Sequence, residues 1–112
     1  DHTERMLTHF GAQVTTTPHG EHGRRIELVG QPELKPAPVV VPADPSSAAF
    51  PIVAAAIVPG SDVTVTGVMM NPLRTGLVTT LIEMGAEIEI LNPRVESGED
   101  IADLRVHGSR LR

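Results

Sequence analysis

The stretch "VVVPADPSSAAFPIVAAAIVPGSDV", Val39 to Val63, decides the fold class because it has no charged residue between Ser47 and Ser61. A membrane-spanning helix needs about 20 apolar residues, and a signal peptide lies at an N-terminus behind basic residues. This run is shorter and central, and the pair Asp44-Pro45 precedes it. An Asx residue followed by proline is typical of a helix start. We therefore predict a buried helix from Pro45 in a soluble protein without a membrane partner.

The composition is that of a globular domain. The 112 residues are enough for one hydrophobic core. The absence of cysteine excludes disulfides and cysteine-ligated zinc, and it favours a cytoplasmic location. A net charge of −5 and only two aromatic residues, Phe10 and Phe50, argue against a nucleic-acid partner, which usually needs a basic face and stacking platforms.

The chain contains an internal repeat with an offset of 74 residues, which places Leu7 on Leu81. The segments "LTHFGAQVTTT" and "LIEMGAEIEIL" align at this offset, and "IELVG" further on resembles "LRVHG" with four residues of slippage. Each copy predicts a short helix that ends at a glycine, then an alternating strand, a polar turn and a second strand. The chain therefore contains the second half of one unit followed by one complete unit.

The complete unit is predicted to have the order β-α-β-α-β-β, with helices packed on a sheet. We place the second half of a unit at residues 1–37 and the complete unit at residues 38–112. The expected helices begin near Asp1, at Asp44-Pro45 and at Asn71-Pro72. Pro51 is expected either to bend the helix that begins at Asp44-Pro45 or to make its first turn tighter than α. The expected strands are Ala12 to Thr17, Arg25 to Val29, Val39 to Val41, Val63 to Val68, Ala86 to Leu91 and Asp103 to His107.

Five segments carry a resemblance to a known family. "DHTERMLTHFGA", "DPSSAAFPIVAAAIVPGSDV", "MNPLRTG", "EMGAEIEILNPR" and "GEDIADLRV" occur in this order across nearly the whole chain. They resemble the 5-enolpyruvylshikimate-3-phosphate synthases (3-phosphoshikimate 1-carboxyvinyltransferases), in particular the bacterial, glyphosate-tolerant class. The resemblance implies an α/β fold, the inside-out α/β barrel of this family, in which two domains each contain three βαβαββ units.

The resemblance also implies a reaction. Family members transfer the enolpyruvyl group of phosphoenolpyruvate to shikimate 3-phosphate in aromatic amino acid biosynthesis, at a site between the two domains. This chain would be an internal, cytoplasmic fragment that is inactive alone, because the family's catalytic lysines and carboxylates lie in other repeats. We therefore expect no catalytic residue here, and neither a cofactor nor a metal.

Two residues are predicted to bind substrate. The resemblance places His2 directly after a segment near the shikimate phosphate. Arg74 is predicted from its position in the first turn of a helix capped by neutral Asn71, where a cation opposes the helix dipole and needs a compensating anion. That anion is either a substrate or an acidic neighbour. Asp44, by contrast, is expected to be a purely structural cap.

Other interpretations remain open. His19 and His22, in "PHGEHG", are expected to lie in a hydrated hairpin tip rather than a metal loop. The chain could belong to a related enolpyruvyl transferase, such as the one acting on UDP-N-acetylglucosamine, or form a non-catalytic βαβαββ module for binding or assembly. In each case an incomplete unit leaves a strand edge and an apolar face uncovered, so we expect the fragment to self-associate.

Overall fold

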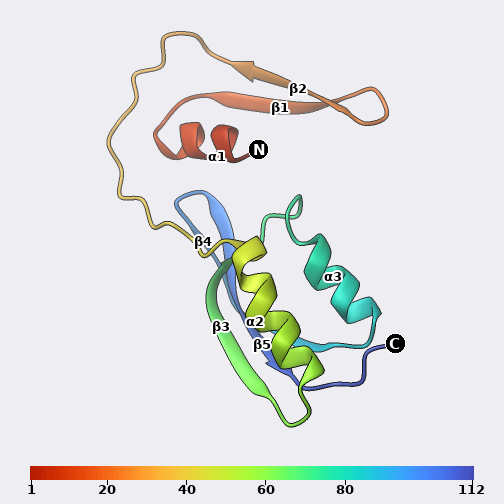
Figure 1. The fold of residues 1–112 in the computed structure, drawn as a ribbon. Helices are drawn as coiled ribbons and strands as arrows, with labels where there is room; N and C mark the ends of the chain where they lie inside the picture. The colour runs from red at the N-terminus through yellow and green to blue at the C-terminus, as the bar shows by residue number, and fades with distance from the viewer. The chain divides into compact units, whose positions relative to one another are not determined.

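The computed structural model describes residues 1–112 and consists of two compact units, unit 1 (Asp1–Val40) and unit 2 (Val41–Arg112) (Figure 1). Unit 1 contains helix α1 (His2–His9) and the strands β1 (Val14–His19) and β2 (Gly23–Leu28). The two strands pair antiparallel without a register shift, from Val14 opposite Leu28 to His19 opposite Gly23. The turn between them contains His22, so the predicted hairpin tip is confirmed.

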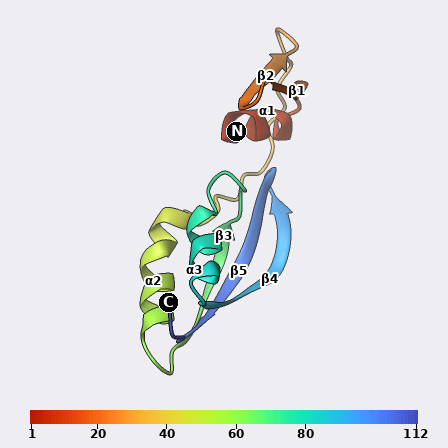
Figure 2. The ribbon, with the colours of Figure 1, turned by 90° about the vertical axis from the view of Figure 1, so that its right-hand side faces the viewer.

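Unit 2 is a layer of two helices on a three-stranded antiparallel sheet. The helices are α2 (Pro45–Ile57) and α3 (Gly76–Glu83), and the strands are β3 (Asp62–Met69), β4 (Glu87–Glu96) and β5 (Glu99–His107). The strand order is β3-β5-β4, which places the last strand in the centre. Both helices lie on the same side of the sheet (Figure 2). None of the helices has the length and apolar character needed to cross a bilayer.

The core of unit 2 lies between α2 and the sheet. Ile52 and Ala56 of α2 are fully or almost fully buried, as are Val68 of β3 and Leu104 and Val106 of β5. Because side chains alternate along a strand, Leu104 and Val106 share the helix side of β5, and the residues between them face the other way. The helix predicted from Pro45 is thus confirmed, and it is the main apolar cover of the sheet.

The two copies of the repeat have the same helix ends. After α1 and after α3, a glycine adopts a left-handed conformation, with φ 95° at Gly11 and 92° at Gly85. In each copy the next amide donates to the carbonyl five residues back, Ala12 to Leu7 and Ala86 to Leu81, both at 2.9 Å. This is the Schellman motif, which glycine permits because it has no Cβ. The repeat inferred from the sequence is therefore also a repeat in backbone geometry.

The predicted strand at Val39 to Val41 is wrong. These residues form no strand, and their side chains are 43%, 53% and 83% exposed. Pro38 and Pro42 flank them, and proline cannot donate to a strand ladder. Only Ala43 reaches the sheet, where it makes a single parallel bridge to Val68.

The predicted helix start at Asn71 is also wrong, because α3 begins at Gly76 after Thr75. Asn71 instead forms a turn: its Oδ1 accepts from the Leu73 amide at 3.0 Å, and its carbonyl accepts from the Arg74 amide at 2.8 Å. Arg74 consequently precedes the helix rather than lying in its first turn.

Pro51 does not tighten the first turn of α2 as expected. That turn is α-helical, and Pro51 lies on the exposed side of a continuous helix.

Candidate functional site

The predicted residue Arg74 belongs to a polar cluster at the N-terminus of α2. Asp44 caps this helix: its Oδ1 accepts from the Ser46 amide at 3.2 Å, and its Oδ2 accepts from the Ser47 amide at 3.0 Å and the Ser47 hydroxyl at 2.9 Å. The predicted cap is therefore confirmed. These bonds satisfy the first free amides of the helix.

Arg74 contacts this cap from the neighbouring loop. Its Nη2 donates to Asp44 Oδ1 at 3.3 Å and to the Ser46 hydroxyl at 3.1 Å. The loop is held in place because Asn71 is fully buried and the Met70 amide donates to the Asp100 carbonyl at 2.7 Å. The cation thus lies at the start of α2, where the Asp44 carboxylate balances its charge.

Hydrogen bonds dominate the electrostatics of this cluster. The pKa of Asp44 lies below its ordinary value, chiefly because the Ser47 hydroxyl and then the Ser46 and Ser47 amides stabilise the carboxylate, with a smaller contribution from Arg74. A carboxylate with this pKa is ionised at neutral pH and cannot act as a general acid. The cluster can hold a helix end and present a cation, and it contains no group arranged for proton transfer.

His2 is the other predicted substrate-binding residue. It is the first residue of α1, directly after Asp1, and its side chain is partly exposed. Asp1 occupies the N-cap position of α1 but makes no side-chain cap bond, and its Oδ2 accepts instead from Arg5 Nε at 3.2 Å. His2 belongs to unit 1 and Arg74 to unit 2.

The structure also contains a polar cluster around Asp103 on β5, which was not predicted from the sequence. Asp103 Oδ1 accepts from the Gly67 amide at 2.8 Å and from Arg94 Nη1 at 3.3 Å, and Oδ2 accepts from Asn92 Nδ2 at 3.1 Å. Gly67 and Asn92 lie in the register shifts of β3 and β4 on either side of β5, both with positive φ. A glycine inside one strand and an Asn-Pro pair inside the other were the signals that could have revealed these bulges.

The rest of this strand face is also charged. Arg105 donates from Nε and Nη2 to the two carboxylate oxygens of Asp62, at 2.9 and 2.7 Å. His107 lies 3.7 Å from Asp62 and 3.6 Å from Glu89. The Arg105 bonds hold the pKa of Asp62 below its usual range, and the Gly67 and Asn92 bonds do the same for Asp103. The strand face away from the helices therefore carries ion pairs instead of an apolar surface.

The comparisons with known proteins agree with this fold. The model of the EPSP synthase (3-phosphoshikimate 1-carboxyvinyltransferase) family matches residues 1–112. A protein named 3-phosphoshikimate 1-carboxyvinyltransferase from Methylobacterium sp. (strain 4-46) is 72% identical over 113 residues, which cover 99% of this chain and 25% of the relative. One of the same name from Rhodopseudomonas palustris (strain HaA2) is 68% identical over 112 residues, again 25% of its length.

A solved structure gives the same result. The EPSP synthase from Acinetobacter baumannii matches with a TM-score of 0.89 and 47% identity, over 97% of this chain and 24% of that one. The chain belongs to the EPSP synthase family, and its α/β fold matches that of EPSP synthase, an inside-out α/β barrel. It spans about a quarter of the length of the curated relatives it matches.

Proposed function

We propose that this chain is an internal segment of an enzyme that transfers the enolpyruvyl group of phosphoenolpyruvate to shikimate 3-phosphate. The observation that carries the proposal is the family match over every residue, together with 72% identity to a relative of which the chain covers 25%. The related transferase acting on UDP-N-acetylglucosamine is the less favoured alternative, because the relatives compared above are named for the shikimate reaction.

The segment contributes part of the protein frame, and the catalytic groups lie elsewhere in the enzyme. Proton transfer to the methylene carbon of phosphoenolpyruvate needs a positioned acid, and binding two phosphorylated substrates needs several cations. The carboxylates of Asp44, Asp62 and Asp103 are all held below their usual pKa by bonds within the fold. Their roles in a cap, an ion pair and two bulges support a structural assignment for them.

His2 and Arg74 are the two positions that we assign to the neighbourhood of the anionic substrates. Support for Arg74 comes from its 42% exposed side chain and from its Nε and Nη1 donors, which have no partner within the chain. Its pairing with Asp44 supports the alternative, in which the acidic neighbour is the only anion it meets. Support for His2 rests on the family resemblance alone.

Arg74→Ala in the complete enzyme separates these two roles. If Arg74 adds to the field at the substrate site, this variant raises the KM for shikimate 3-phosphate and leaves the Tm nearly unchanged. A lower Tm with unchanged kinetics would assign Arg74 to the Asp44 pair alone. Arg105→Ala is the matched control, because Arg105 also pairs with one aspartate but lies on the strand face away from the helices.

We assign the complete enzyme to the bacterial, glyphosate-tolerant class because of the five segments that carry the family resemblance, and we assign it to the cytoplasm with that family. Retention of activity in the presence of glyphosate tests the class, and inhibition comparable with that of a sensitive synthase would reject it.

Phosphate release by the purified chain tests the segment assignment. It should stay at the uncatalysed rate, because groups from the rest of the protein are required to position both substrates. Turnover by the chain alone would contradict the proposal.

A further inference from the structure

The two repeats carry a surface hollow at the same place in their hairpins, with different chemistry. Each hollow has a volume of about 290 Å³. In unit 1 its lining includes Thr16 and Arg24, and in unit 2 it includes Ile90 and Ala102. These are equivalent positions in the repeat. Thr16 corresponds to Ile90 by the offset of 74. After the four residues of slippage the offset is 78, which places Arg24 on Ala102 and Ile26 on Leu104.

The strand registers support this equivalence. Thr16 pairs with Ile26 in unit 1, and Ile90 pairs with Leu104 in unit 2. These two positions are therefore apolar in unit 2, where the charged residues of the lining are Arg94 and Asp100, and in unit 1 they carry a hydroxyl and a guanidinium. Since the fold does not require polar groups at these positions, their presence in unit 1 points to a role of their own.

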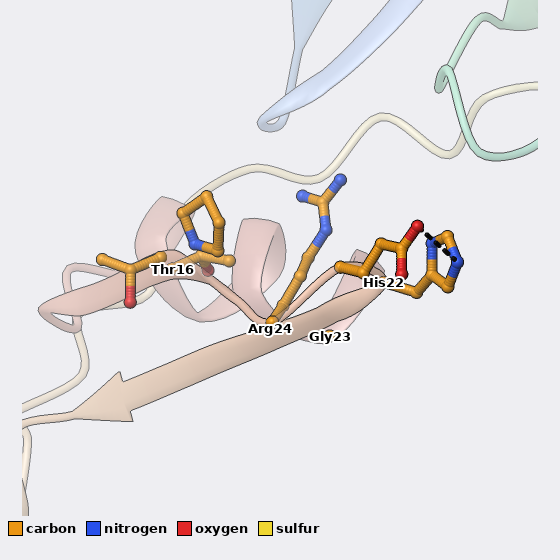
Figure 3. Close-up of a pocket in the computed structure, with 8 residues that line it drawn as sticks. Thr16, His22, Gly23 and Arg24 are labelled. Atoms are coloured by element: carbon orange, nitrogen blue, oxygen red, sulfur yellow. Dashed lines mark ion pairs between the residues drawn. The ribbon is translucent and has the colours of Figure 1, made fainter.

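The Arg24 side chain makes no ion pair or hydrogen bond within the chain. In its neighbour Arg25, by contrast, Nη2 lies 2.7 Å from Glu27 Oε1. Arg24 pairs with Pro18, and directly paired residues share a face of the hairpin. Thr16 lies two residues before Pro18 and is therefore on this same face, whereas Arg25 is on the other. Figure 3 shows the Arg24 side chain rising from the hairpin between Thr16 and His22.

The remaining charges at the hollow do not neutralise Arg24. Glu21 is the one carboxylate in the lining, and its Oε1 lies 4.0 Å from His22 Nε2 (dashed in Figure 3). The Thr16 hydroxyl also makes no bond within the chain, so it is available to a ligand in the same hollow. A planar guanidinium and a hydroxyl donor in the lining of one hollow match the oxygens of a phosphate group.

We propose that the hollow of the β1–β2 hairpin binds a phosphoryl group, as inorganic phosphate or a phosphate monoester, through the Arg24 guanidinium and the Thr16 hydroxyl. This site stands apart from the proposed transferase activity, because it depends only on residues of one hairpin. Its failure would leave that activity untouched.

Titration of the 112-residue chain with inorganic phosphate and then glycerol 3-phosphate, at constant ionic strength and neutral pH, tests the site. We expect both ligands to shift the Arg24 Nε–Hε and Thr16 amide NMR signals in a saturable manner. Because Arg24→Gln removes the charge that strengthens the hydrogen bonds to phosphate oxygens, it should weaken binding by about tenfold or more. Thr16→Val should weaken it less, and Arg25→Gln, the matched control, should leave it unchanged.

Two results would overturn the proposal. The first is a linear response that chloride reproduces, and the second is equal affinity in the Arg24→Gln and Arg25→Gln variants. Amide spectra of each variant, unchanged outside the hairpin, show that the loss of binding is not a loss of folding.

Discussion

Asp103 is the residue on which the irregular part of the unit 2 sheet depends. From the central strand it accepts hydrogen bonds from Gly67 on one neighbour and from Asn92 on the other, and so satisfies a bulge on each side. The equivalent position in unit 1 is Arg25, and the hairpin there has no register shift. One carboxylate thus explains why two copies of the same repeat differ in strand geometry.

Asp103→Asn tests this role. The variant loses the charge and one acceptor oxygen, and we expect its Tm to fall on the order of 5 °C. The native pKa of Asp103 is lowered, so its contribution to stability is present above the unfolded pKa of about 3.9 and is lost as the pH falls through the native pKa. Denaturant unfolding from pH 6 down to about pH 3 should therefore show a shallower acid decline for the variant than for the parent. Equal slopes would contradict the assignment.

Asp44 and Arg74 should differ in their effect on stability although they contact each other. Asp44→Ala removes the cap of α2 and should lower the Tm by about 5 °C. Arg74→Ala removes an exposed ion pair and a hydrogen bond to the Ser46 hydroxyl, and it should change the Tm by less than about 2 °C. Thermal unfolding of both variants and of the double variant measures this, and a larger effect of Arg74→Ala than of Asp44→Ala would show that the cap is not the dominant contribution.

At the scale of elements, the sequence predicted best where a local signal and the tertiary structure agree. Asp44-Pro45 precedes a long apolar run that the sheet can bury, and α2 begins there. Asn71-Pro72 has the same local signature, but the buried Asn71 side chain forms a turn and α3 starts four residues after Pro72. The apolar run Val39 to Val41 has high strand propensity, yet its flanking prolines and the lack of a partner strand prevent pairing.

The site was less predictable than the elements. Arg74 could be selected from the sequence as a cation near a helix start, but the Asp44 carboxylate that it contacts lies 30 residues away. The cluster around Asp103 joins three strands, and its partners lie 36, 11 and 9 residues away. Contacts of this kind depend on register, which a single sequence does not specify when bulges intervene.

The Schellman ends of α1 and α3 give a prediction for an element boundary. Gly85 has φ 92°, and a Cβ there would lie 3.4 Å from the Arg110 carbonyl oxygen. Since a side chain in the left-handed region costs about 1–2 kcal/mol, Gly85→Ala should reduce the free energy of unfolding by about that amount. Gly76→Ala is the control: its φ is not in the left-handed region and space is open, so we expect no loss and a gain of up to about 1 kcal/mol. Denaturant titration measures both, and equal effects would reject the motif as the cause.

At the scale of the whole molecule, the two faces of unit 2 differ in what they can contact. The strand face carries the ion pairs of Asp62, Asp103 and Arg105, whereas the helices and their loops expose apolar side chains, including Phe50 at 80% and Leu73 at 60%. Exposed apolar groups of this kind usually mark an interaction surface. We expect the rest of the complete enzyme to cover this surface.

The isolated chain should therefore self-associate. Its uncovered apolar side chains and the free edges of its two sheets both favour contacts between copies. Light scattering over a concentration series should show a mass that rises with concentration. Phe50→Glu should reduce the association, and the same mutation in the complete enzyme should destabilise it. A monomer at every concentration would contradict this expectation.

The activity of a chimaera tests the central claim most directly. In this chimaera, residues 1–112 replace the matching quarter of the Methylobacterium relative, to which they are 72% identical. If the chain is the corresponding segment of an enolpyruvyl transferase, phosphate release from phosphoenolpyruvate and shikimate 3-phosphate should proceed with a kcat/KM within about tenfold of the parent enzyme, a difference of 1.4 kcal/mol. A chimaera that folds with the parent's Tm but releases phosphate only at the uncatalysed rate would contradict the claim.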